Sequence, residues 1–592
     1  MESGHKGFQH RGTSYTESEM KKHADNGFYE TKEGNAVCST TGDVVIGEHT
    51  VQRALEQRHI SMIAIGTGLF LGMGEALNKG GPVGLVLGYL VMGLVVYAMT
   101  VALGEMVTMF PVSGSFTHYP CRFVDPALGF AVGWNYWYSM TIAVPSEVIA
   151  SAIVVEYWKA PVNKAVWVTL FIVLGCAINF LGVRWYGEQG ADRLFTWYPH
   201  VCEPTSAAVK VVAVVILIIV GIVIDLGKNA FMLYLKLSAR SLLIRSSLGG
   251  TPTHDRIGLR HIINPGPFNQ LHGIPGATGR FLAFWTVFLQ ASYSYMGTEM
   301  VAITAGEAAN PRKTVPKAIE RVFYRILVFY LGSTITVGLL VPSTSPELLG
   351  GTGDASSSPF VIAIKSAGIT VLPDLINVVI LVSAISAASS KLYGGSRVLF
   401  GLSKDGMAPR IFSKCNGSGL PIWALMATCS AAGLSYMCLN NQASVAFQWF
   451  QNLSAMTGIL TWWAVLVSYL FFYNGMKVQG YSRDTLHYKA PFQPYASWIG
   501  VIMLTVIMFM SGFEVFLKGG WSISDFLANY LTLPIFLGFY LYWKIAKRTK
   551  FVSPKHMDFV TGTRELDEMD AQEREKAVVP TTKWGKFIDW NL

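Results

Sequence analysis

The chain has 592 residues, of which 51% are hydrophobic and only 14% charged, whereas an ordinary soluble protein carries about 25% charged residues. So few charges cannot cover the surface that the apolar stretches would need in water, and lipid is therefore the predicted solvent for most of the chain. This composition argues against a soluble enzyme, a disordered protein and a nucleic-acid binder. The net charge of +9 reflects Lys and Arg that gather between apolar stretches and at the C-terminus, where they set membrane topology.

Residues 1–50 are polar and contain no apolar core, which predicts a disordered tail and argues against a cleaved secretory signal. Beyond this tail, about twelve apolar stretches of roughly 20 residues each predict transmembrane helices. The predicted spans are 60–78, 82–109, 129–157, 164–182, 207–226, 281–305, 322–341, 371–393, 421–439, 444–473, 495–517 and 527–545.

The distribution of positive charge favours an orientation with both termini in the cytosol. The loops that are then cytoplasmic hold most of the Lys and Arg between spans, while the short outer loops hold few, as the positive-inside rule requires. The outer loop 227–280 is basic as well, but long loops are largely exempt from that rule. We therefore expect a transmembrane domain over 51–546, with cytoplasmic tails over 1–50 and 547–592.

An even number of helices with both tails inside suits a transporter, and many transporters contain two inverted repeats with broken helices at the midplane. Each half should then carry a glycine-interrupted span at the matching position. Span one holds Gly-Thr-Gly at 66–68, and span six holds Tyr-Met-Gly-Thr-Glu at 295–299. The offset of five spans predicts an all-α polytopic membrane protein with about 12 transmembrane helices, a 5+5 inverted-repeat core and discontinuous helices 1 and 6.

In span one, glycine lets the backbone leave helical geometry, and the N–H groups of the half-helix that follows can bind a carboxylate. Gly66, Thr67 and Gly68 are the candidates for this role. The alternative is close helix packing, because Gly68 and Gly72 also form a small-xxx-small pair. Spacing alone leaves both interpretations open.

Ionisable residues at membrane depth are candidates for binding substrate or protons, because a charge there is costly unless it has a partner. Glu299 could meet an ammonium or carry a proton, and the alternative is a buried hydrogen-bond acceptor between helices. Lys210, near the inner end of span five, either snorkels to the interface, which composition favours, or stays buried and exchanges protons. Glu147, which follows Pro145 in span three, is a further candidate.

The sequence contains no HExxH, GxSxG or Walker motif, and residues 66–68 lack the third glycine and the preceding strand of a dinucleotide-binding turn. No nucleophile, base or metal-ligand cluster takes their place. We therefore predict no enzyme activity, no cofactor and no metal site.

Several sequence blocks together resemble the fungal amino acid permeases of the amino acid, polyamine and organocation superfamily. The resemblance runs from about 53 to 562 and is carried by the blocks 58–70, 104–106, 111–116, 297–299, 306–307, 310–313, 393–397 and 490–495. It implies a LeuT-like transporter in the plasma membrane that imports L-amino acids with protons by alternating access. Its partners would be the amino acid substrate, protons and the lipid bilayer, with no nucleic acid.

The resemblance also implies roles for individual residues. The two breaks would bind the substrate, and spans three, eight and ten would shape the side-chain pocket. In related transporters a span-five lysine is a proposed proton carrier, and Lys210 is similar to it, with Glu147 and Glu299 as further coupling candidates. A broad neutral preference is expected, because the pocket shows no obvious charge beyond Glu299. The implied substrate-binding residues are Ile65, Gly66, Thr67, Gly68, Tyr295, Met296, Gly297, Thr298, Glu299 and Ser389.

The chain also departs from the family pattern. About one helical turn is absent before Gly66, and the segments 189–206 and 229–248 are atypical. In span eight, Ser389 stands where the family usually has Asn, and Lys391 is out of pattern. The alternatives to import are therefore an amino acid sensor with weak or no transport, and an inactive splice or gene-model variant of a permease.

Overall fold

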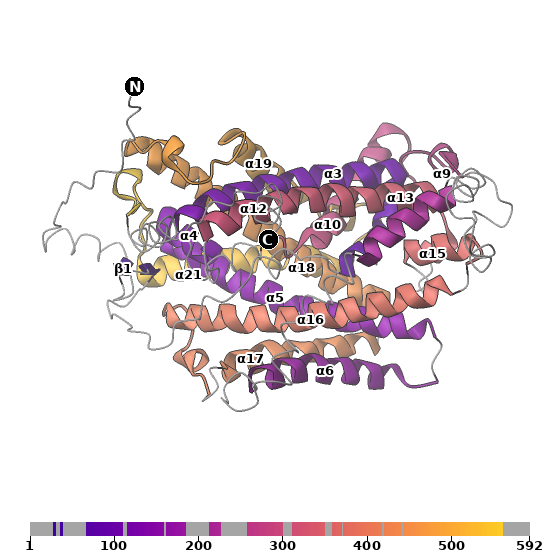
Figure 1. Ribbon diagram of the computed structural model, residues 1–592, viewed down its shortest axis with the longest axis horizontal. Coiled ribbons are helices and arrows are strands. Elements are labelled where there is room, and N and C mark those ends of the chain that lie inside the picture. Colours follow the sequence, from indigo (N-terminus) through magenta and orange to yellow (C-terminus); the bar gives the residue numbers. More distant parts are fainter. Residues whose placement is uncertain are drawn as a thin grey trace, which may run out of the picture.

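The computed structural model describes residues 28–30, 36–38, 67–70, 72–110, 115–158, 161–184, 212–225, 257–299, 311–349, 358–369, 371–416, 420–439 and 443–560. Within these ranges the regular structure is helical apart from one small hairpin. The longer helices run side by side along the long axis of the molecule (Figure 1). The predictions for Ile65, Gly66 and Lys210 fall outside the described residues.

In the described part of the chain, six helices are long and apolar enough to cross a membrane, or seven if one bent pair counts as a single span. A spanning helix needs about 20 mostly apolar residues. The six are α3 (Gly72–Met109), α5 (Pro126–Glu156), the run Val315–Leu340, α16 (Leu372–Lys404), the run Ile422–Leu439 and α18 (Ala443–Val478), and the bent pair is α20 (Ile523–Tyr530) with α21 (Thr532–Lys547). The chain is therefore a multi-pass membrane protein.

Four further helices coincide with predicted spans four, five, six and eleven but are shorter or more polar. They are α6 (Lys164–Arg184), the apolar helix Val212–Asp225, α10 (Gly276–Tyr295) and α19 (Tyr495–Met510). Every predicted span thus coincides, at least in part, with helix among the described residues. The exact number of twelve and the two inverted repeats stay predictions.

Shorter elements connect and extend these helices. They are η1 (Thr67–Leu69), α4 (Ser115–Phe123), α9 (Arg260–Ile263), η3 (Leu271–Gly273), α12 (Pro311–Arg325), the π-helical η4 (Ile326–Leu331), α13 (Gly332–Leu340), α14 (Pro346–Leu349), α15 (Pro359–Ser366), η6 (Arg410–Ser413), α17 (Ile422–Ser430), η7 (Ala431–Leu439), η8 (Arg483–Thr485), η9 (Phe513–Phe516) and η10 (Pro554–His556).

The end of predicted span one and the whole of span two lie in one element, α3, joined by a kink at Gly81. Gly81 has φ 77°, and a Cβ there would lie 2.8 Å from the backbone nitrogen of Asn269, so only glycine fits. Pro82 follows, and its fixed φ suits the start of the second helical segment. The backbone therefore changes direction between two spans with almost no connecting loop.

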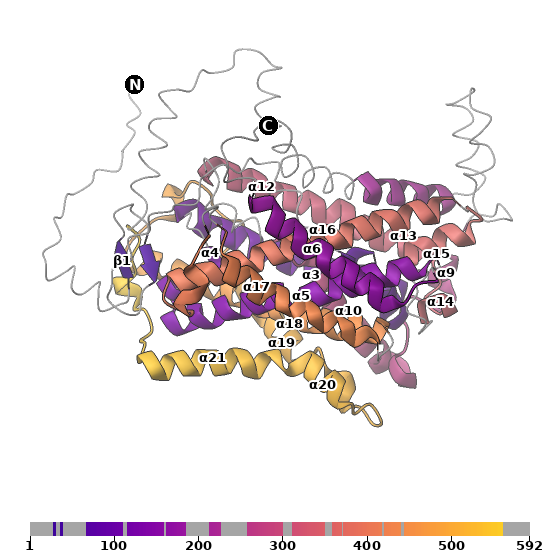
Figure 2. The same cartoon turned by 90° about the horizontal axis from the view of Figure 1, so that it is seen from below.

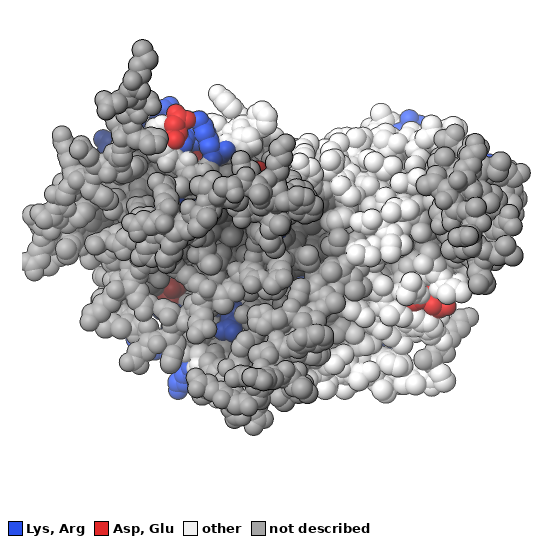
Figure 3. Space-filling view, in the orientation of Figure 1, with Lys and Arg blue, Asp and Glu red and all other residues white. Residues whose placement is uncertain are grey.

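Two packed groups of helices meet at the centre of the molecule. In one, α3 packs against α10, α12 and α13; in the other, α5 packs against α16 and α18 (Figures 1 and 2). The helices α6 and α17 cover α16, and α21 packs along α5. On the face shown in Figure 3, the described residues are largely uncharged, and most of the charged side chains that can be seen lie in the left half of the view. Few charges are expected on a surface that faces lipid, because a charged side chain there is costly.

Part of the predicted disordered tail forms regular structure. The strands β1 (Phe28–Glu30) and β2 (Ala36–Cys38) pair antiparallel, with Tyr29 opposite Val37. Aromatic and β-branched residues suit a strand, and the intervening sequence contains Gly34 and Asn35, which favour a turn. Both strands lie within residues 1–50, for which a disordered tail stays a prediction.

A buried ion pair joins the C-terminal end of α3 to the loop after α18. Arg483 donates to both oxygens of Glu105, at 2.8 and 2.7 Å, and the same carboxylate accepts from the backbone N–H of Ala490 and the hydroxyl of Tyr469. Glu105 is fully buried, although it lies near the end of a membrane helix, where a carboxylate could have faced water. Hydrogen bonding to Glu105 raises the pKa of Arg483 above its ordinary value.

The chain after α21 folds back onto the helical core. Arg122 contacts Asp558 through its side chain at 3.2 Å and donates to its backbone carbonyl at 2.9 Å. The buried Phe559 ring packs against Phe123 and Phe472. The first part of the segment expected to be a C-terminal tail is therefore attached to α4 and α18.

Arg483→Ala tests how far the Glu105 cluster holds the end of α3 in place. The substitution leaves a fully buried carboxylate without its charge partner, which costs about 3–5 kcal/mol. We expect a clearly lowered melting temperature of the purified protein in detergent.

The matched control is Lys489→Ala, which removes a lysine of the same loop whose partner Asp484 is, like Lys489, well exposed. Exposed ion pairs contribute little to stability, so this variant should have the same melting temperature as the unaltered protein. Equal melting of Arg483→Ala and Lys489→Ala would contradict a stabilising role for the buried pair.

Candidate functional site

Regular helix ends in the middle of predicted span six. The helix α10 stops at Tyr295, Met296 takes ψ 140°, and Gly297 takes φ 96°. The N–H groups of Met296 and Thr298 still reach the carbonyls of Tyr293 and Tyr295, each at 3.3 Å. The backbone therefore leaves helical geometry where the sequence predicts it, because only glycine adopts such a φ without strain.

The described part of predicted span one is also irregular. Thr67 begins the short 3₁₀ turn η1, and α-helical geometry starts only at Gly72. A Cβ on Gly68 would lie 2.7 Å from the ring of Tyr293 and 3.1 Å from the Cα of Ser294. The irregular turn of span one thus packs directly on the last turn of α10, next to the break in span six.

Glu299 folds back onto the break in span six. Both of its carboxylate oxygens lie 3.1 Å from the backbone nitrogen of Gly297, and the Trp462 indole N–H donates to Oε2 at 3.2 Å. Glu299 is 2% exposed. The carboxylate therefore satisfies an N–H that the break releases and ties the break to α18, which fits the interpretation of Glu299 as a hydrogen-bond acceptor between helices.

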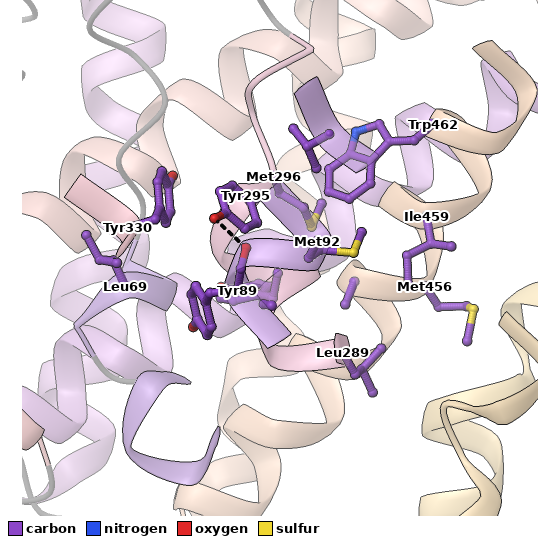
Figure 4. Packing of buried hydrophobic residues seen from close by; sticks show 14 of the residues in the cluster. Leu69, Tyr89, Met92, Leu289, Tyr295, Met296, Tyr330, Met456, Ile459 and Trp462 are labelled. Carbon is purple, nitrogen blue, oxygen red and sulfur yellow. Dashed lines mark hydrogen bonds between the residues drawn. The ribbon is translucent and has the colours of Figure 1, made fainter. Parts of the chain in front are cut away.

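The side chains of Tyr295 and Met296 pack into the core. The Tyr295 hydroxyl donates to the Tyr89 carbonyl of α3 at 2.9 Å, and its ring lies 4.3 Å from that of Tyr330 in the π-helical turn η4 (Figure 4). Met296 lies against Gly458 of α18, because a Cβ added to Gly458 would lie 3.2 Å from the Cγ of Met296. These contacts hold the end of α10 between α3 and α18.

One face of α18 carries buried polar atoms that have no hydrogen-bond partner among the described residues. The amide of Gln451 and the hydroxyl of Ser454 are both in this state, and the two residues are 1% and 0% exposed. The Gln451 amide lies at the start of α3, 3.3 Å from where a Cβ of Gly72 would be. Such groups in a buried position call for a ligand or water.

This face of α18 lies against both irregular segments, that before Gly72 and that after Tyr295. Gln451, Ser454 and Gly458 follow each other at intervals of three and four residues and therefore lie along one side of α18. Gln451 meets Gly72 at one end of the row, and Gly458 meets Met296 at the other. Thr298, whose buried hydroxyl also lacks a partner, belongs to the same break as Met296. Sequence reasoning missed Gln451, although a polar pair three residues apart in an apolar stretch was a signal for it.

Glu147 lies near the same place, on α5. Its carboxylate accepts from the Tyr293 hydroxyl at 3.4 Å, and Lys391 of α16 lies 3.7 Å away. The Tyr293 hydroxyl also meets the hydroxyl of Ser146 at 3.0 Å. Glu147 is 1% exposed. The Tyr293 ring lies between Glu147 and Gly68, because its hydroxyl reaches Glu147 and its edge packs on Gly68.

Ser389 lies apart from these residues. Its hydroxyl and its carbonyl both accept from the amide of Asn179 on α6, at 3.1 and 3.2 Å. Lys391 lies two residues further on, which is about 200° around the helix, and faces α5. The structure thus brings together Gly68, Glu147 and residues 295–299, while Ser389 ties α16 to α6.

The sequence matches the profile described as "Amino acid permease" over residues 59–555. It is 35% identical over 558 residues to the proline-specific permease of Emericella nidulans, covering 92% of this chain and 94% of that protein. It is 36% identical to the dicarboxylic amino acid permease of Saccharomyces cerevisiae, covering 91% of this chain and 85% of that protein.

Among solved structures, the chain is similar to a variant of the Eremococcus coleocola manganese transporter. The identity is 12%, the alignment covers 83% of this chain and 93% of that chain, and the TM-score is 0.47.

Gly297→Val tests whether the break depends on glycine. A β-branched residue at φ 96° is strained by about 1–3 kcal/mol, and relief of this strain would separate the Gly297 N–H from Glu299. We expect a lower melting temperature in detergent than for Gly538→Val, because a Cβ at Gly538 would meet nothing within 4 Å. If the two variants melt together, the break does not need a glycine.

Proposed function

We propose, from the premise that this chain belongs to the amino acid permease family, that it imports L-amino acids together with protons across the plasma membrane of a fungal cell. Transport would proceed by alternating access in a core of two inverted five-helix repeats, with about twelve spans and both termini in the cytosol. As a member of a family of transporters, the chain is not an enzyme.

The observation that carries this proposal is the meeting of two irregular segments beside a buried polar face. The turn before Gly72 packs on the end of α10, next to the break at Gly297. Gln451 and Ser454 offer polar atoms there without partners. In lipid, irregular backbone is tolerated where it is buried in protein or lines a cavity, and in carriers the substrate binds at such breaks.

The two ends of a zwitterion suit the two helix ends. The N-terminal end of α3 carries N–H groups and a positive partial charge, so it would bind the carboxylate, with the Gln451 amide as a further donor. The C-terminal end of α10 carries the negative partial charge, and Glu299 stands next to it, so the ammonium would lie on that side. Backbone groups of Thr67 and Gly68, together with those of Ile65 and Gly66, would contribute to the same substrate-binding site.

Protons are the proposed driving ion. Moving one positive charge inward along a membrane potential releases about 2.3 kcal/mol per 100 mV. Lys210, which the resemblance singles out, is the first candidate for the proton carrier. Glu147 and Glu299 are buried carboxylates close to the two irregular segments and are the other candidates.

The substrate class is not set by overall similarity, because identity to a proline-specific permease and to a dicarboxylic amino acid permease is almost the same, at 35% and 36%. We propose a broad preference for neutral amino acids. The breaks supply backbone groups, and the unpartnered atoms of Gln451, Ser454 and Thr298 are uncharged.

Uptake of labelled amino acids tests the proposal in permease-deficient yeast cells that express the 592-residue chain. We expect accumulation that a protonophore abolishes and that increases as the external medium is acidified, because the proton gradient supplies the drive. Accumulation that survives the protonophore would contradict proton coupling, and binding without accumulation would identify a sensor. Cells with surface protein that neither bind nor accumulate any amino acid would contradict the amino acid role.

Lys210→Ala separates coupling from folding within this assay. Loss of a proton-carrying amine should remove the pH dependence of uptake while the amount of protein at the cell surface stays the same. Lys228→Ala, in the long loop after span five, is the matched control and should keep the pH dependence. An unchanged pH dependence of uptake in Lys210→Ala would contradict a proton-carrying role. It would favour the alternative that the Lys210 ammonium extends to the membrane interface.

A further inference from the structure

Lys391 is a lysine in the interior of a long membrane helix. The helix α16 runs over Leu372–Lys404, so Lys391 lies about 20 Å from its C-terminal end at 1.5 Å per residue. Its side chain is 18% exposed and is turned toward α5. Charged residues at this depth are rare and usually mark a functional site.

The surroundings of Lys391 include a carboxylate and an aromatic ring. Its Nζ lies 3.7 Å from Oε1 of Glu147 and 5.8 Å from the ring centre of Tyr293. A separation of 3.7 Å is longer than an N–H···O hydrogen bond, so the attraction is that of an ion pair. A carboxylate together with the face of an aromatic ring is the arrangement that binds an ammonium or guanidinium group.

This cation site lies beside the proposed substrate site. The Tyr293 ring that faces Lys391 also packs on Gly68, and its hydroxyl reaches Glu147 and Ser146. A substrate held by its carboxylate and ammonium at the breaks would therefore extend its side chain past Tyr293 toward α5 and α16. The charged end of a lysine or arginine substrate would need the place that Lys391 already fills.

We propose that Lys391 is a specificity-determining residue: it is a tethered cation that occupies the cation subsite formed by Glu147 and Tyr293, and so excludes lysine and arginine as substrates. The proposal rests on the proposed function and deepens it, because it gives a physical reason for uptake of neutral amino acids.

The test compares L-lysine with neutral amino acids in the same permease-deficient cells. For the unaltered chain, excess unlabelled L-lysine or L-arginine should fail to compete with uptake of labelled L-proline or L-leucine, whichever is carried. In Lys391→Met, which keeps the apolar stem and removes the charge, the ratio of lysine uptake to neutral uptake should rise about tenfold or more.

Two further variants separate charge from packing. Adding Glu147→Gln to Lys391→Met removes the subsite's negative charge, so L-lysine should again fail to displace a bound neutral amino acid from the purified protein, a readout that needs no proton coupling. Lys365→Met is the matched control, because Lys365 also faces an aromatic ring, that of Tyr157, at 4.6 Å, but lies away from the breaks. It should leave the ratio unchanged.

The inference fails if L-lysine competes in the unaltered chain as well as neutral amino acids do, a result that needs no variant to fold. It also fails if Lys391→Met reaches the surface and carries neutral amino acids with an unchanged ratio. In the first case proton-coupled import of amino acids stands, but the proposed neutral preference is lost with the inference. In the second case the proposed function stands in full. Absence of all uptake and binding by the unaltered chain at the surface would overturn the proposed function itself, and this inference with it.

Discussion

The structure depends on one constraint, which is that a backbone N–H or C=O inside lipid must have a partner within the protein. A break in span six therefore needs a local replacement for the helical hydrogen bonds that it gives up. Glu299 supplies it by accepting from the N–H of Gly297, and Trp462 holds the carboxylate in place. The acidic residue beside the glycine is thus part of what makes the break possible, whatever further role it has with a substrate or a proton.

The helix α18 connects the parts of the candidate site. Its residues Gln451, Gly458 and Trp462 meet the start of α3, Met296 and Glu299 respectively. A single helix therefore contacts both irregular segments, and a shift of α18 against α3 and α10 would change the candidate site at both ends. Such a shared element fits a mechanism in which one group of helices moves against another around a fixed site.

Two ion pairs that involve a buried carboxylate differ in their geometry. Arg483 is bound to Glu105 by two short hydrogen bonds, which fastens a loop to the end of α3. Lys391 and Glu147 are 3.7 Å apart and adjoin the breaks. In the first pair the carboxylate accepts four hydrogen bonds, which suits a structural role. The second pair is a longer contact, which suits a site where charge decides what enters.

The sequence by itself determined the membrane class, the approximate position of most helices and the end of regular helix near Gly297. These follow from composition, from apolar length and from glycine, which act locally. It did not determine that Ser389 faces α6, that Gln451 lies at the start of α3, or that Lys391 meets Glu147. Those partners are distant in the chain, and in lipid every helix has an apolar surface all round, so periodicity alone cannot tell which faces meet. Only the packing of the helices decided which polar groups became neighbours.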